Sequence, residues 1–103
     1  MPLFSTVALV CATMVGDGGT VCILHTYDKF QAFSDANCYV AMRNVHYKLN
    51  NEMKKQAGVL RLEKGSYNCY STIAHRDSVI DRVMKTISDG GVMYAITKLD
   101  KDR

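Results

Sequence analysis

The sequence repeats one order of segments: two strand-like runs joined by a glycine turn, followed by a run with helical spacing. The first copy covers residues 3–55 with its turn at 16–19, and the second covers 59–88 with its turn at 65–66. A last apolar run follows at 92–99. Hairpins and amphipathic helices of this kind bury their apolar sides against one another. The repeat therefore predicts an α+β fold.

Within that class we expect the order ββαββαβ, with a mainly antiparallel sheet of about five strands and two helices packed on one face. The 103 residues suit one compact domain, 1–103, which is long enough to bury a core without covalent staples. Its charged end, 99–103, is expected to be a frayed tail.

The first apolar run, residues 3–15, lacks the alternation of a half-buried strand. Apolar side chains on both faces are typical of a central strand that is covered on both sides, or on one side by a partner subunit. Because both helices are expected on one face, the other face has to be hidden, which predicts a homodimer. The run has no Lys or Arg before it and no Ala-x-Ala-like site after it, and it is too short to span a bilayer as a helix. We therefore expect a cytoplasmic protein without a membrane partner.

The first turn predicts how its two strands pair. A two-residue type I′ turn at 17–18 suits Asp-Gly, because both central positions need positive φ. Such a turn sets Thr13 opposite Cys22 and Cys11 opposite Leu24. The two thiols are then diagonal neighbours, too far apart for an easy disulfide.

The chain has four cysteines and no C-x-x-C pair, which disfavours zinc ribbons and thioredoxin-type motifs. We expect them to be free thiols buried in the core, with disulfides, metal binding and redox roles as alternatives. They are Cys11, Cys22, Cys38 and Cys69.

Both helices carry recognisable signals. The first begins at Asp28 or Ser34, each of which can cap a helix, and the second is capped by Asp77 or Ser78. The apolar side chains of the first helix recur every three or four residues, which predicts a narrow stripe facing the sheet: Cys38, Met42, Val45, Leu49 and Met53.

The second hairpin, with its turn at 65–66, is expected to set Leu62 opposite Cys69. On the other face of the sheet Arg61 then lies opposite Tyr70.

Motifs that suggest catalysis or metal binding each meet an objection. His75-Arg76-Asp77 has the letters of a kinase catalytic loop, but the chain is too short and lacks the other kinase elements. Cys22-x-x-His25 resembles half a metal site, yet residues three apart on a strand point to opposite faces. We therefore expect no catalytic residues, no metal site and no cofactor. A small thiol- or His-dependent enzyme, with His75 beside Cys69 or Asp77, is an alternative.

The least ordinary surface is the outer face of the first helix, which mixes aromatic and basic residues. The chain carries a net charge of +3, and residues 43–64 contain six Lys or Arg against two Glu. This basic zone suits an acidic protein surface or phosphates, although a solvated helix face is the ordinary alternative. The expected binding residues are Tyr39, Arg43, Tyr47, Lys54, Lys55, Arg61 and Tyr70.

Together these features predict a small non-enzymatic interaction or regulatory protein that binds another protein, for example a phage or mobile-element protein that inhibits a host factor. The alternative is a single-stranded nucleic-acid-binding module that uses the basic, tyrosine-containing region 43–70, in which tyrosines stack on bases and basic side chains contact phosphates.

Overall fold

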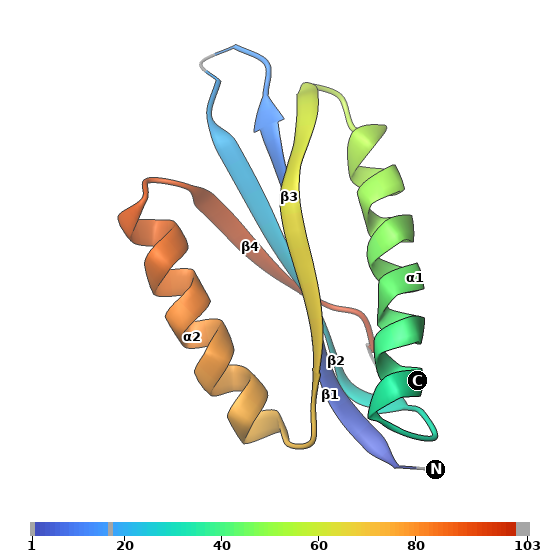
Figure 1. Cartoon of the computed structure of the whole chain (residues 1–103). Coiled ribbons are helices and arrows are strands. Elements are labelled where there is room, and N and C mark those ends of the chain that lie inside the picture. Colours follow the sequence, from blue (N-terminus) through green and yellow to red (C-terminus); the bar gives the residue numbers. More distant parts are fainter. Residues whose placement is uncertain (1, 17, 101–103) are drawn as a thin grey trace.

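A mixed sheet of four strands forms the centre of the protein in the computed structural model, which describes residues 2–16 and 18–100. The chain order is β1 (Leu3–Met14), β2 (Thr20–Gln31), α1 (Asp35–Lys54), β3 (Val59–Tyr70), α2 (Ile73–Asp89) and β4 (Met93–Lys98) (Figure 1). The strands lie in the order β3-β1-β2-β4. β1 is antiparallel to both of its neighbours, whereas β4 is parallel to β2. The α+β class is confirmed, but the sheet has four strands and is not wholly antiparallel.

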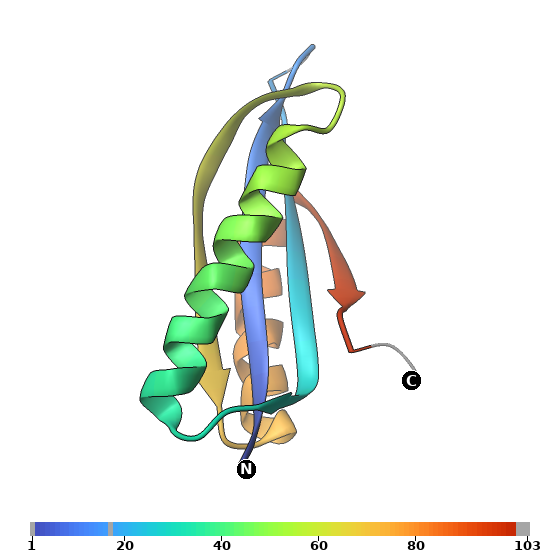
Figure 2. The same cartoon turned by 90° about the vertical axis from the view of Figure 1, so that its right-hand side faces the viewer.

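The two helices lie on opposite faces of the sheet, so the prediction that both pack on one face is wrong (Figures 1 and 2). The cause is the strand order. β2, β3 and β4 all run in one direction, since β2 and β3 are both antiparallel to β1 and β4 is parallel to β2. The chain crosses from β2 to β3 through α1, and then returns across the sheet to β4 through α2. Two crossovers of the same hand that travel in opposite directions must use opposite faces.

The expected second hairpin does not form, because residues 59–70 make one continuous strand. Gly65 lies at a β-bulge in β3, where the pairing with β1 shifts between Leu9 and Cys11. A Cβ at Gly65 would collide with the Leu9 carbonyl oxygen and would lie 2.7 Å from Nε2 of His46. That Nε2 donates to the Leu9 carbonyl at 3.0 Å. The glycine therefore makes room for a helix side chain to reach the bulged ladder, and the expected pairs Leu62–Cys69 and Arg61–Tyr70 are absent.

The core between α1 and the sheet agrees with the helical stripe. Cys38 and Met42 are fully buried, and they pack with Phe4 and Ala8 of β1. Of the two predicted caps, Ser34 is the correct one: its Oγ accepts the Asn37 backbone N–H at 3.2 Å.

All four cysteines form disulfides, Cys11–Cys22 and Cys38–Cys69, so the expectation of free thiols is wrong. Cys11 lies directly opposite Cys22, a register two residues away from the predicted one. A two-residue shift keeps every side chain on its predicted face and brings the diagonal cysteines together. The turn that was expected to set the register includes residue 17, which lies outside the described residues. The second bridge ties α1 to β3.

The second face of the sheet is covered by α2, which begins earlier than expected. Thr72, not Asp77 or Ser78, caps the helix, and its Oγ1 accepts the His75 backbone N–H at 3.1 Å. α2 packs on β1, β3 and β4. The central strand is therefore covered on both sides within one chain, and its apolar character gives no reason for a dimer. Among the described residues, no helix has the length and apolar character needed to cross a membrane.

A polar cluster anchors α2 and the end of the chain to β2. Arg76, whose side chain is 5% exposed, donates to Asp28 at 2.7 Å, to the Tyr27 carbonyl at 2.8 Å and to Asp77 at 2.9 Å. Lys98 contacts the other Asp28 oxygen at 2.7 Å. These two cations, Lys98 first and Arg76 next, hold the pKa of Asp28 below its usual value of 3.8.

The last described residues are also attached to β2. The Leu99 N–H donates to the Thr26 carbonyl at 2.6 Å. The Asp100 carboxylate accepts the backbone N–H groups of Asp28 and Lys29 at 2.7 and 2.8 Å. The expectation of a frayed tail is therefore wrong for Leu99 and Asp100, which are hydrogen-bonded to β2. Residues 101–103 of that tail lie outside the described residues.

Candidate interaction surface

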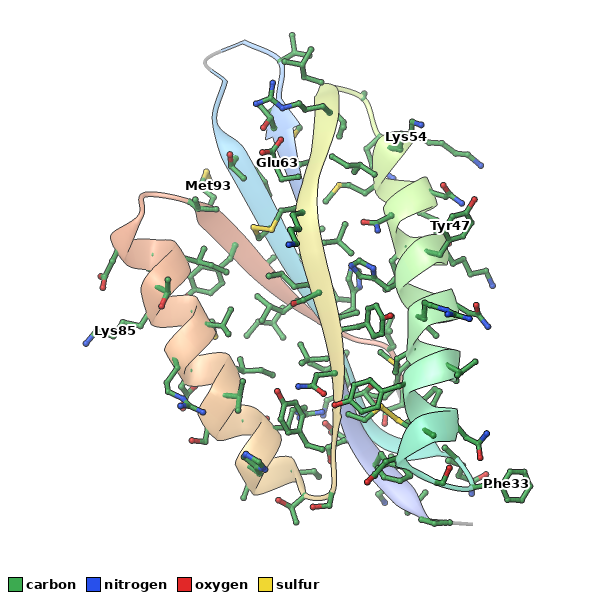
Figure 3. The ribbon with its side chains drawn as sticks, viewed as in Figure 1. Phe33, Tyr47, Lys54, Glu63, Lys85 and Met93 are labelled. Carbon is green, nitrogen blue, oxygen red and sulfur yellow. A yellow bond between two sulfur atoms is a disulfide. The ribbon has the colours of Figure 1, made fainter. Side chains whose placement is uncertain are left out.

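The outer face of α1 is an exposed strip of aromatic and basic side chains. Tyr39, Arg43 and Tyr47 follow one another at four-residue spacing, so they lie on one side of the helix. Lys54 continues that side about 22 Å along the axis from Tyr39, at 1.5 Å per residue. Tyr47 is 70% exposed, and Figure 3 shows Tyr47 and Lys54 pointing away from the sheet. The buried stripe on the opposite side of α1 determines which residues face outward.

An aromatic residue that the sequence analysis missed extends this face at its N-terminal end. Phe33 directly precedes the Ser34 cap, the position from which an apolar side chain commonly packs back onto the fourth helical residue. That residue, Cys38, is fully buried, yet Phe33 is 75% exposed and projects away from the molecule (Figure 3). The one sequence signal at Phe33 is its spacing from Cys38, and that spacing predicts that the ring packs against the helix. The observed ring instead points into solvent.

Tyr39 is held in place at the border between α1 and β3. Its hydroxyl hydrogen-bonds to Oδ1 of Asn68, and the same oxygen accepts the Cys69 backbone N–H at 2.9 Å. The Asn68 amide nitrogen in turn donates to the Tyr70 hydroxyl at 2.9 Å. Because the ring of Tyr39 is fixed before any partner arrives, burying it at an interface costs little side-chain entropy.

Arg61 lies on the other side of the sheet. Its Nε donates to the Glu63 carboxylate at 2.8 Å, and that carboxylate also accepts from Thr13 Oγ1 at 3.0 Å. These partners, Arg61 first and Thr13 next, lower the pKa of Glu63. Glu63 pairs with Cys11, whose disulfide is on the α2 face of the sheet. The charge of Arg61 is therefore matched locally, on the face opposite α1.

Tyr70 also belongs to the α2 side. Its ring meets the His75 ring of α2 edge-on, with the centroids 5.0 Å apart. Nine residues of strand, about 30 Å, separate it from Arg61. The structure thus places five predicted residues on α1 and at its C-cap, namely Tyr39, Arg43, Tyr47, Lys54 and Lys55. Arg61 is far from them, whereas Tyr70 lies on the α2 side of β3 and is linked to Tyr39 through the side chain of Asn68.

The outer face of α1 is positively charged over most of its length, and Asp35 in the first turn is the acid on the same side. Within residues 2–16 and 18–100, no ion pair involves Arg43, Lys54 or Lys55. The one glutamate of α1, Glu52, turns to the other side of the helix and lines a groove of about 210 Å³ beside β2. The cationic charge on the outer face is therefore not neutralised by a neighbouring carboxylate.

His25 of β2 lines the same groove, with Nδ1 buried and without a hydrogen-bond partner among the described residues. Burial is the main reason why its pKa lies below 6.5; nearby Glu52 raises the pKa, and His46 lowers it. Cys22 points the other way, into its disulfide, as the strand geometry predicted. The described part of the chain brings no three His, Cys, Asp or Glu side chains together in a way that could hold a metal.

The pairs considered for catalysis are not assembled in this structure. The Cys69 sulfur is bonded to Cys38, and the His75 ring lies against Tyr70. Asp77 accepts hydrogen bonds from Nε and Nη2 of Arg76. A thiol-dependent reaction at Cys69 would first need the disulfide to be reduced.

No protein-family model, curated protein or solved structure matches the chain. The features that bear on function are therefore those of its own surface, above all the outer face of α1.

Proposed function

We propose that this protein is a non-enzymatic binding module whose outer face of α1 docks on an acidic surface of another protein. The observation that carries the proposal is the strip of exposed aromatic and unpaired basic side chains on a helix that is otherwise firmly packed. Tyr and Arg are enriched at the energetic centres of protein interfaces. Positive side chains without local partners complement carboxylates on a partner and speed its approach.

The rigidity of α1 supports the same function. The helix is capped by Ser34, buried along its stripe and linked to β3 through Cys38–Cys69. A surface that is already ordered loses little conformational entropy on binding. Such a module suits a regulator or inhibitor, and the identity of its partner would decide whether it acts on a host factor.

The compartment of the interaction is best inferred from the cysteines. Two disulfides are typical of oxidising surroundings, and they are rare in cytosolic proteins outside hyperthermophiles. We therefore propose that the protein meets its partner under oxidising conditions, in place of the cytoplasmic location expected from the sequence.

Single-stranded nucleic acid is the second candidate, favoured by the same tyrosines and cations. The separation of Arg61 from α1 and the position of Tyr70 on the α2 side of the sheet weaken this candidate, because a single strand would have followed a longer series of such groups on one face. The two partners differ in salt dependence: each phosphate contact releases counterions, so nucleic-acid affinity falls steeply between 50 and 200 mM salt, by roughly 10³-fold for six contacts.

Affinity capture from the native source, followed by titration of the partner that is found, tests the proposal. Arg43→Ala combined with Tyr47→Ala should weaken binding more than tenfold while the melting temperature stays nearly unchanged, since both side chains are exposed. The matched control, Arg82→Ala with Lys85→Ala on the exposed side of α2, should bind like the wild type. Equal binding by both double variants, or loss of binding only together with loss of folding, would sink the proposal.

A further inference from the structure

β4 is an edge strand that leaves apolar side chains uncovered on both of its faces. Met93 is 73% exposed, Ile96 51% and Tyr94 39%. The pairing with β2 places Tyr94 and Ile96 on the same side as Cys22 and Leu24, toward α2, and Met93 on the other side. α1 packs on β3 and β1 and does not reach β4, which forms the right-hand edge of the molecule in Figure 2.

The opposite edge of the sheet, β3, is protected against pairing with another strand. It is interrupted by the bulge at Gly65, beside the charged Lys64. Farther along, the Asn68 side chain occupies the Cys69 N–H, and Tyr39 from α1 binds the same side chain. Bulges, lysines and side-chain caps are the devices by which proteins prevent edge-to-edge association.

β4 carries none of these devices along most of its length. Residues 93–97 contain no charge, proline or glycine, and the β2–β4 pairing runs without a register shift. The one charged residue, Lys98, stands at the end of the strand and is paired with Asp28 at 2.7 Å. An uncharged, largely apolar edge at the far side of a sheet whose other edge is protected is prone to pair with another strand.

We propose that β4 pairs antiparallel with β4 of a second copy of this chain about a two-fold axis, which joins two four-stranded sheets into one of eight strands. The charge pattern favours a second copy. Antiparallel pairing puts the two Lys98 residues at opposite ends of the interface, where each lies beside the uncharged start of the other strand. A two-fold axis also lets the same apolar patch cover itself, as closed dimers require. This interface leaves the outer face of α1 free, so it is independent of the function proposed above.

The oligomeric state of the full chain tests this inference. Light scattering or sedimentation equilibrium over a wide concentration range should give twice the 11.5 kDa of one chain at high concentration. Met93→Lys should shift the protein to the monomer, because each new lysine would stand at the same end of the interface as Lys98 of the other strand, where the like charges repel. The matched control is Leu60→Lys on the β3 edge, where Leu60 is 61% exposed, and this variant should dimerise like the wild type.

Hydrogen exchange on the wild-type protein locates the interface without any substitution. The outward-facing amides of β4 should exchange at least tenfold more slowly at dimer concentrations than after dilution. A monomeric mass at every concentration overturns the proposal, as does a dimer that survives Met93→Lys or is dissociated by Leu60→Lys. Slowed exchange on β3 in place of β4 would equally overturn it.

Discussion

At the scale of single residues, the buried guanidinium of Arg76 is a site where a substitution should strongly lower the stability of the fold. It lies among the Tyr27 carbonyl, Asp28 and Asp77, and Lys98 approaches the same Asp28 carboxylate from the strand end. A buried charge is tolerated only when its partners are present, so the cluster acts as one unit that joins α2, β2 and β4.

Asp28→Asn should lower the free energy of unfolding at pH 7 by about 2–3 kcal/mol, because Arg76 keeps Asp77 and a carbonyl but loses its closest carboxylate. The pH dependence has a definite sign. The pKa of Asp28 is depressed in the folded state, so its contribution is complete above the unfolded value near 3.8 and disappears as the pH falls through the lower folded value.

Urea unfolding at pH 7, 4 and 2.5 measures both effects. The wild type should lose stability at the acid end, and Asp28→Asn should show a flatter profile. Asp81→Asn, at an exposed acid of α2, serves as the control and should follow the wild-type profile. If the unfolding free energy of the Asp28→Asn variant fell with acid as much as that of the wild type, the protonation of Asp28 would not be the cause of the acid sensitivity.

At the scale of elements, the two helices differ in how their side chains fill the space against the sheet. α1 buries Cys38, Met42 and Met53 and leaves a polar-edged groove of about 210 Å³ beside β2, whereas α2 buries Arg76 and Ile80 and borders an apolar pocket of about 120 Å³ over the sheet. The pocket is lined by Val79 and Val83 from α2 and by Leu9 and Leu24 from the strands. Unfilled apolar space forfeits dispersion contacts and lowers stability.

Val83→Leu should therefore stabilise the protein by about 1 kcal/mol, since the added methylene enters existing space. The same change on the α1 side, Val10→Leu, should destabilise it by about 1–3 kcal/mol, because Val10 is fully buried in a filled core. Thermal and urea unfolding of the two variants give opposite shifts if the faces differ as described. Shifts of the same sign would mean that they are packed alike.

How much could be anticipated from sequence depended on whether the deciding interaction was local. The Ser34 cap and the apolar stripe of α1 were predictable because each is settled within one or two helical turns. Gly65 was misjudged because a glycine inside a strand-like run signals a turn and a bulge equally, and only the distant His46 and Leu9 distinguish them. The Cys11–Cys22 disulfide was missed through a register error of two residues, which no local signal near the first turn reveals. Cys38–Cys69 was missed because the expected second hairpin placed Cys69 opposite Leu62.

In the candidate surface, too, the residues positioned by local spacing were predictable and those positioned by distant contacts were not. Its α1 members were predictable from helical spacing. The placement of Arg61 and Tyr70 depended on a hairpin that does not exist. Phe33 was missed because its exposure contradicts the local packing rule for that position.

At the scale of the whole molecule, two disulfides join different parts of the fold. Cys11–Cys22 closes a separation of 11 residues within one strand pair, whereas Cys38–Cys69 closes 31 residues and joins a helix to an edge strand. In the chain-entropy model a disulfide stabilises the fold by removing loop-closure entropy from the unfolded chain, and this stabilisation grows with loop length, to about 2.8 kcal/mol for the shorter loop and about 3.7 kcal/mol for the longer.

Replacing Cys38 and Cys69 by Ala should thus lower the free energy of unfolding by about 3–4 kcal/mol, and replacing Cys11 and Cys22 by about 2–3 kcal/mol. The ranking is checked by urea unfolding of both double variants. Reduced wild-type protein should lose more stability than either variant. Unchanged stability of the wild type under reducing conditions would show that neither link contributes.

The position of β4 also has a consequence for the order in which the protein is made. β1 and β2 are neighbours in the chain and can pair as soon as both have been synthesised, but the strand that covers the far side of β2 begins only at Met93. Until then β2 is itself an unprotected edge, and the contacts that cover it span about 70 residues of chain, which form slowly. During synthesis β2 is therefore open to pairing with other chains until residues 93–98 have been made.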